Sequence, residues 1–94
     1  METADMKVDG NAIGGLLLEL FGAEMTVAIT TCASCGARAE VARLDVYVRC
    51  PGTVVRCPRC GAVLMRIVEG RARTWVDLSG TALLELGRPA TPPA

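Results

Sequence analysis

The chain has 94 residues, of which 51% are apolar, 21% charged and 3% aromatic. This length allows one small domain with a thin core and leaves no room for a two-domain catalytic cleft. Ten basic and ten acidic residues give a formal net charge of zero, so the overall charge indicates no class of partner. No apolar run approaches the roughly 18 residues of a membrane span, and the acidic start lacks the features of a secretory signal. We therefore expect a cytoplasmic protein with no membrane contact.

The first 21 residues are expected to contain a flexible start and one short helix. Residues 1–8 show no apolar period and are predicted to be flexible. A helix is predicted over residues 11–21, with Asp9 or Asn11 as its cap and Gly22 at its end. Its apolar stripe consists of Ile13, Leu16, Leu17, Leu20 and Phe21.

This apolar stripe needs a cover, because a helix of about ten residues is not stable alone in water. Packing on the chain's own sheet is the favoured interpretation. The alternative is a homodimer through the N-terminal helix, with Gly14 and Gly15 allowing close approach. Leu18 lies outside the stripe and is a candidate contact for a partner or a second copy.

The rest of the chain has the pattern of short strands. Alternation of apolar and polar residues predicts strands at 25–30 and 43–49. Pro51-Gly52 is predicted to be a turn before a short strand at 53–56, and segments 62–68 and 72–78 a hairpin. Residues 81–86 fit either a helical turn or an edge strand. The proline-rich residues 87–94 have nothing to bury and are expected to be disordered. The fold class is thus a small, mostly β, α+β protein with a single domain at 9–86.

Two Cys-x-x-Cys-Gly turns, or knuckles, are the clearest motif. They hold Cys32, Cys35, Cys57 and Cys60, and the chain has no histidine. Two such turns can place four thiolates at the corners of a tetrahedron, which is the arrangement of a structural zinc site. We predict one Zn²⁺ per chain, with iron less favoured because the chain is poor in aromatic residues. A site closed by four thiolates has no open position for a substrate, so we do not expect an enzyme.

The fifth cysteine, Cys50, precedes Pro51 and is interpreted as a small buried residue at the end of a strand. A redox role or a role as an alternate ligand is the other interpretation. Trp75 shares one strand face with Arg73 and Asp77. A core tryptophan beneath the N-terminal helix is favoured; the alternative is an exposed partner contact formed by these three residues.

The middle of the chain is basic. Residues 32–75 carry eight arginines against three carboxylates, a net charge of +5, whereas residues 1–31 carry five carboxylates against one lysine, a net charge of −4. Solvated surface charge is the simplest interpretation. The alternative is contact with nucleic-acid phosphates, for which the candidate residues are Arg38, Arg43, Arg49, Arg56 and Arg59.

Several segments together resemble a family of short actinobacterial proteins of unknown function. The segments are Asp9-Gly10-Asn11-Ala12, Gly15-Leu16-Leu17, the two knuckles, Val46-Tyr47-Val48 and Trp75-Val76-Asp77-Leu78. The resemblance covers about residues 8–86. It implies a zinc-ribbon-like fold and assigns no residue role beyond the four knuckle cysteines. The knuckles are also similar to those of rubredoxin and of zinc ribbons in transcription and translation proteins.

Three functions follow from these observations. The favoured one is a structural zinc protein that acts as a protein-interaction module. The second is a nucleic-acid-binding zinc ribbon, a transcriptional accessory that uses the arginine-rich residues 38–73. The third is a rubredoxin-like electron-transfer protein or a thiol redox protein.

Overall fold

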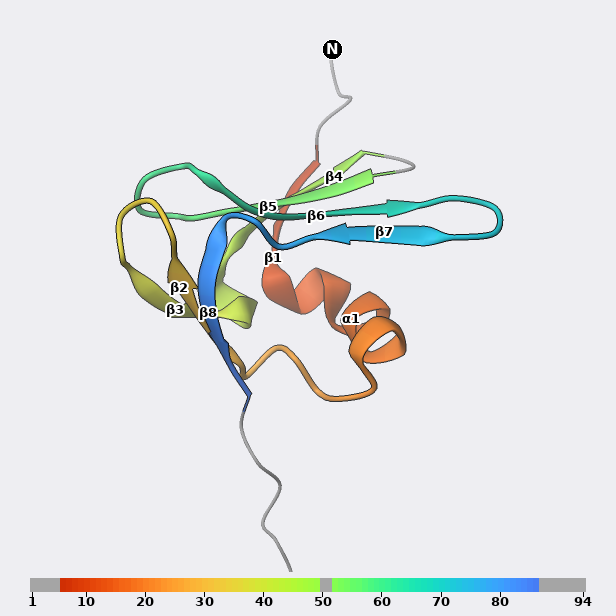
Figure 1. Ribbon diagram of the computed structural model, residues 1–94, viewed down its shortest axis with the longest axis horizontal. Helices are drawn as coiled ribbons and strands as arrows, with labels where there is room; N and C mark the ends of the chain where they lie inside the picture. Colours follow the sequence, from red (N-terminus) through yellow and green to blue (C-terminus); the bar gives the residue numbers. More distant parts are fainter. Residues whose placement is uncertain (1–5, 50–51, 87–94) are drawn as a thin grey trace, which may run out of the picture.

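The computed structural model describes residues 6–49 and 52–86. They form a mostly β structure with two antiparallel sheets and one α-helix (Figure 1), which confirms the expected class. The larger sheet has the strand order β1-β4-β5-β6-β7. Its strands are β1 Met6–Asp9, β4 Asp45–Arg49, β5 Gly52–Arg56, β6 Val63–Glu69 and β7 Thr74–Asp77. The smaller sheet has the order β3-β2-β8, with β2 Ile29–Cys32, β3 Arg38–Glu40 and β8 Thr81–Glu85.

Strands β4 to β7 pair with their neighbours in sequence and form a meander, close to the predicted ranges 43–49, 53–56, 62–68 and 72–78. Strand β1 is different, because it pairs with the distant β4 and sets Val8 opposite Val46. The expectation of a flexible segment at 1–8 is therefore wrong for residues 6–8. Four residues carry too little alternation to be recognised as a strand, and only the partner strand fixes their conformation.

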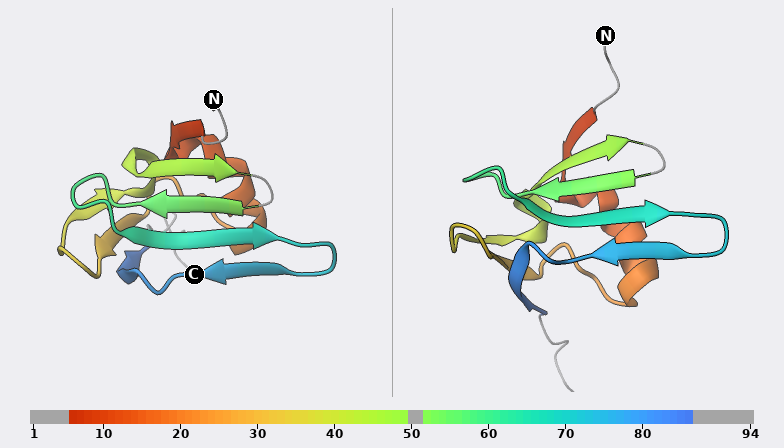
Figure 2. Two further views of the ribbon diagram at one scale, coloured as in Figure 1. Left: turned by 90° about the horizontal axis from the view of Figure 1, so that it is seen from above. Right: turned by 45° about the horizontal axis from the view of Figure 1, so that its top comes forward.

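The core lies between one face of the larger sheet, the smaller sheet and helix α1 Gly14–Phe21 (Figures 1 and 2). Val46, Val55 and Ile67 project from the covered face of the larger sheet and are fully buried. Leu17 contributes the most buried side chain of α1. The opposite face of the larger sheet has no covering element among the described residues (Figure 2).

A short N-terminal α-helix is confirmed, but it begins at Gly14, and residues 11–13 of the predicted helix 11–21 belong to a 3₁₀ helix instead. Residues Gly10–Ile13 form a 3₁₀ helix, and the Asp9 carboxylate accepts a hydrogen bond from the Asn11 amide at 3.0 Å. Gly22 ends α1 in the left-handed region with a φ of 71°. Of the predicted stripe, Ile13 and Leu17 are buried, whereas Phe21 is exposed.

The strand predicted at 25–30 is wrong over residues 25–28. Residues Thr26 and Val27 form a turn, strand β2 begins only at Ile29, and Val27 is 58% exposed. Met25 and Ala28 are the buried residues here, so the buried positions are three apart rather than two. The backbone is fixed from outside the segment, because the Ala28 and Thr26 carbonyls accept hydrogen bonds from Val41 and Ala42 in the second 3₁₀ helix, Val41–Arg43.

The undecided segment 81–86 forms strand β8, which lies at the edge of the smaller sheet and sets Leu84 opposite Thr30. The chain passes from β7 in the larger sheet to β8 in the smaller sheet through the turn at Ser79-Gly80, which the sequence predicted as a break. Cys50, Pro51 and the tail 87–94 lie outside the described residues.

Candidate metal centre

The two knuckles have the same backbone structure. Cys32 ends β2 and Cys57 directly follows β5. In the first knuckle, the Cys32 amide donates to the Ala37 carbonyl at 2.9 Å; in the second, the Cys57 amide donates to Ala62 at 2.8 Å. The glycines that follow, Gly36 and Gly61, have φ values of 78° and 81°, a conformation that other residues adopt with strain. The sequence motif therefore predicts both turns from local geometry alone.

The fold brings the four predicted cysteines together. Their sulfur atoms all lie within 4.8 Å of one another. Two sulfur pairs that join the knuckles, Cys32 with Cys60 and Cys35 with Cys57, are both separated by 3.7 Å. This distance is far longer than a disulfide bond, and the four thiols are free. A tetrahedron with zinc–sulfur bonds of about 2.3 Å has sulfur–sulfur edges of about 3.8 Å. The described sulfur positions therefore fit a four-thiolate metal site.

Backbone amides point at the sulfurs and favour their anionic forms, since an N–H donor stabilises a thiolate. The donors and distances are Ser34 to Cys32 at 3.3 Å, Cys35 to Cys32 at 3.5 Å, Arg59 to Cys57 at 3.4 Å and Ala62 to Cys60 at 3.4 Å. The Cys35 amide, helped by that of Ser34, lowers the pKa of the Cys32 thiol to about 7. The Ala37 amide lowers the pKa of Cys35, but desolvation and the three neighbouring thiols raise it to about 11. The cluster thus holds one thiol with a lowered pKa, Cys32, and one with a raised pKa, Cys35, and a bound cation would neutralise neighbouring thiolates.

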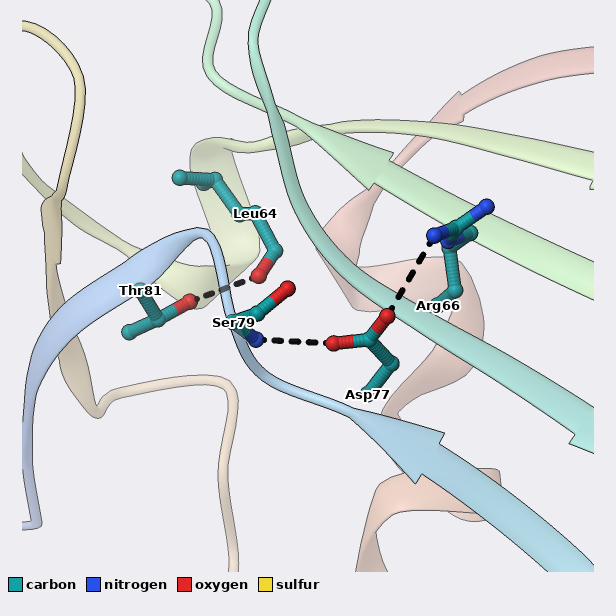
Figure 3. A network of polar contacts seen from close by, with 5 residues as sticks. All are labelled: Leu64, Arg66, Asp77, Ser79 and Thr81. Atoms are coloured by element: carbon teal, nitrogen blue, oxygen red, sulfur yellow. Dashed lines mark hydrogen bonds and ion pairs between the residues drawn. The ribbon is translucent and has the colours of Figure 1, made fainter.

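A polar network near the metal centre joins the two sheets (Figure 3). The Thr81 hydroxyl at the start of β8 donates to the Leu64 carbonyl of β6 at 3.0 Å. The Asp77 carboxylate accepts from the Ser79 amide at 2.9 Å and from the Arg66 guanidinium at 3.3 Å. The Ser79 amide and the Arg66 guanidinium hold the pKa of Asp77 below its usual range, so the carboxylate stays ionised at neutral pH.

Gly80 links this network to the first knuckle, because its carbonyl accepts a hydrogen bond from the Ala33 amide at 3.0 Å. A Cβ on Gly80 would lie 1.8 Å from the Val63 carbonyl oxygen, so only glycine fits between the two sheets here. The sequence indicated a turn at this position. It contained no sign of this close approach, which depends on β6.

Three of the arginines proposed for nucleic-acid contact lie near one another, because Arg38 lines one surface pocket with Arg43 and another with Arg59. Arg38 pairs with Glu85 on the smaller sheet, and Arg43 pairs with Glu40 beside the second 3₁₀ helix. Arg56, on β5, donates to the Gly61 carbonyl at 2.8 Å, and its guanidinium lies 6.0 Å from the centre of the Tyr47 ring. Arg59 is exposed in the second knuckle, and the side chain of Arg49 lies outside the description. Of the three neighbouring arginines, Arg38 and Arg43 are each paired with a carboxylate, which reduces the free positive charge of this surface.

The residues proposed for partner contact divide between two surfaces. Leu18 is 48% exposed on α1, beneath the covered face of the larger sheet. Trp75 is 58% exposed, so its interpretation as a core residue is wrong. It lies opposite Val68 on the uncovered face, while its neighbour Val76 lies opposite the buried Ile67. Arg73 is exposed close to Trp75, and Asp77 is half-buried in its pair with Arg66.

Comparison with known proteins places the chain in a family. Residues 2–89 match the family of unknown function DUF6510. The chain belongs to this family. The expected membership in a family of unknown function is thereby confirmed. No curated protein and no solved structure matches the chain. Among the described residues, no helix of this DUF6510 member is long and apolar enough to cross a membrane.

Proposed function

We propose that the protein is a zinc-ribbon-like domain in which one Zn²⁺, bound by Cys32, Cys35, Cys57 and Cys60, holds together a module that docks with another protein. The observation that carries this proposal is the convergence of four sulfur atoms within 4.8 Å of one another, with backbone amides directed at them. Zinc supplies a divalent charge that neutralises neighbouring thiolates and prefers four tetrahedral ligands. Four thiolates fill that coordination, so the site supports folding rather than catalysis.

A docking role is supported by the exposed large apolar side chains, which include Leu18, Trp75 and Leu83. Binding to nucleic acid has less support, because such surfaces combine a continuous basic track with aromatic stacking platforms. Here four basic side chains pair with carboxylates, and the candidates Arg38 and Arg43 are among them. Protein binding is therefore the function that the described surfaces support best.

The metal site is tested by elemental analysis of the purified chain and two cysteine variants. We expect one zinc per chain, no visible absorption from iron, and loss of the metal in Cys57→Ser. The matched control is Cys50→Ser, which also removes one thiol but leaves the four proposed ligands, and it should keep its zinc. Zinc lost equally from both variants would show that Cys50 is a ligand and that the proposed set is wrong.

The docking role is tested by affinity capture from the cell extract of the source organism with the immobilised, zinc-loaded chain. Parallel captures are made with and without nuclease. We expect the same protein in both arms. Recovery that depends on intact nucleic acid would favour the nucleic-acid-binding alternative instead.

A further inference from the structure

The hairpin formed by β6 and β7 extends past the end of α1 and presents its tip away from the rest of the domain (Figures 1 and 2). Every residue from Val68 to Val76 is exposed. The turn is closed by a hydrogen bond from the Gly70 amide to the Arg73 carbonyl at 2.8 Å. The tip is thus a closed turn that is accessible to a partner. Its side chains belong neither to the metal site nor to the buried core.

Trp75 is held in place on this tip although it is largely exposed. A Cβ on Gly70 would lie 2.8 Å from the Trp75 ring, so the indole packs directly over the glycine backbone. Val68 lies opposite Trp75 in the register and shares its face of the sheet. Gly52 lies opposite Val68 on the next strand and adds little side-chain bulk. Indole, valine and glycine therefore form a shallow apolar floor.

Two arginines lie in the turn between β6 and β7, next to this floor in sequence. Arg71 and Arg73 are exposed, and neither pairs with a carboxylate of residues 6–49 or 52–86. By contrast, Lys7, Arg38, Arg43 and Arg66 each pair with a carboxylate. We name Val68, Arg71, Arg73 and Trp75 the hairpin patch. It combines an anchored tryptophan with two guanidiniums, and tryptophan and arginine are both enriched among the residues that dominate binding energy at protein interfaces.

From this arrangement we infer that the hairpin patch docks an acidic segment of a partner protein, whose apolar side chain packs on Trp75 while its carboxylates pair with Arg71 and Arg73. The inference rests on the proposed docking function and adds the surface and the chemistry of the partner. Charge complementarity selects an anionic partner, and the apolar floor selects one with an aliphatic or aromatic side chain among its carboxylates.

A protein segment fits this patch better than a nucleic acid does. Asp77 lies two residues from Trp75 on the same strand and stays ionised, and Glu69 lies at the base of the turn. These carboxylates interrupt the positive charge along the hairpin. A nucleic acid would need a continuous row of positive charges to bind its successive phosphates. A short acidic segment that crosses the tip needs only the two arginines.

The test uses the zinc-loaded full chain and a short synthetic peptide in which leucine and phenylalanine lie among aspartates and glutamates. Trp75 is the only tryptophan, so its fluorescence reports on the hairpin patch directly. We expect the peptide to shift the emission to the blue in a saturable way. A peptide with the same apolar residues among lysines, and a short oligothymidine, should cause no shift. Binding of the oligothymidine in place of the acidic peptide, or no shift with the acidic peptide at millimolar concentration, would overturn the inference.

Variants locate the binding. In calorimetric titrations, Arg71→Glu with Arg73→Glu, and separately Trp75→Ala, should each weaken acidic-peptide binding by at least about tenfold. The matched controls Arg43→Glu and Val27→Ala change exposed residues outside the hairpin and should stay within about twofold. Unchanged affinity in the double-arginine variant would refute the hairpin patch. The proposed docking function would survive that result if affinity capture still recovered the same protein with that variant, since docking would then use another surface.

Discussion

At the scale of single residues, Gly80, like Gly10, is a position where an added Cβ would overlap a backbone carbonyl oxygen. A Cβ on Gly80 would lie 1.8 Å from the Val63 carbonyl oxygen, and this atom belongs to backbone that cannot rotate away. Gly80→Ala should therefore lower the free energy of unfolding by more than about 2 kcal/mol, as overpacking against a fixed neighbour does. It should also weaken zinc binding, because the Gly80 carbonyl holds the first knuckle through Ala33. Denaturant unfolding and competition with a zinc chelator measure the two effects.

The control for Gly80→Ala is the same substitution at Gly15. No atom outside the helix lies within 4 Å of a Cβ built at Gly15, which is in the first turn of α1. Alanine favours a helix by up to about 1 kcal/mol over glycine, so Gly15→Ala should be neutral or stabilising. Equal loss of stability in the two variants would show that the contact at Gly80 does not explain the effect.

Individual residues also show where sequence reasoning succeeds and where it stops. The four cysteines were predictable because each Cys-x-x-Cys-Gly turn is fixed by a few adjacent residues. The exposure of Trp75 was not predictable, because it depends on which face of the sheet α1 covers. An eight-residue helix is only about 12 Å long and cannot reach the end of the hairpin. The turn at Gly80 was predictable, but the need for glycine there was not, because the close contact comes from Val63 in β6, which is distant in sequence.

At the scale of elements, α1 offers a direct comparison of two adjacent leucines. Leu17 is 1% exposed in the core, whereas Leu18 is 48% exposed. Leu17→Asp would bury an unpaired carboxylate, and we expect it to destabilise the fold by at least about 3 kcal/mol. Leu18→Asp should leave the melting temperature nearly unchanged. Thermal melting of the zinc-loaded proteins measures both.

Sedimentation of Leu18→Asp then tests association through α1. If the chain forms a dimer through this helix, the folded variant should sediment as a monomer while the unmodified chain does not. Should Leu18→Asp melt as early as Leu17→Asp, α1 is buried on all sides and the assignment of Leu18 to the surface is wrong.

The elements themselves were predictable to different degrees. Strands β4 to β7 carry clear alternation or tight turns and were found close to their observed bounds. Strand β1 and the turn before β2 were missed because their conformation is set by hydrogen bonds to distant segments, Val46 and Val41 among them. The pairing of β8 with β2 across the smaller sheet could not be derived from either strand alone.

At the scale of the whole molecule, the metal centre lies where the two sheets meet. One pair of cysteines lies at the end of β2 in the smaller sheet, and the other lies directly after β5 in the larger sheet. The buried residues form one cluster that includes Cys32 and Cys57 together with Val46 and Ile67. A metal bound between the knuckles would therefore link the smaller sheet to the larger one. Two of its ligands, Cys32 and Cys57, are themselves part of the core.

Because two ligands of the metal site belong to the core, we predict that the fold and the metal are lost together. A structural zinc site contributes on the order of 10–16 kcal/mol of apparent binding free energy at neutral pH, whereas the net stability of a small domain is about 5–15 kcal/mol. Removing zinc with a strong chelator should therefore unfold both sheets in one transition. Amide hydrogen exchange should show protection lost together at Thr30 in the smaller sheet and at Val55 and Ile67 in the larger one. If the larger sheet kept its protected amides after zinc removal while the smaller sheet lost them, the meander would be an independent folding unit and the zinc would only attach the smaller sheet to it.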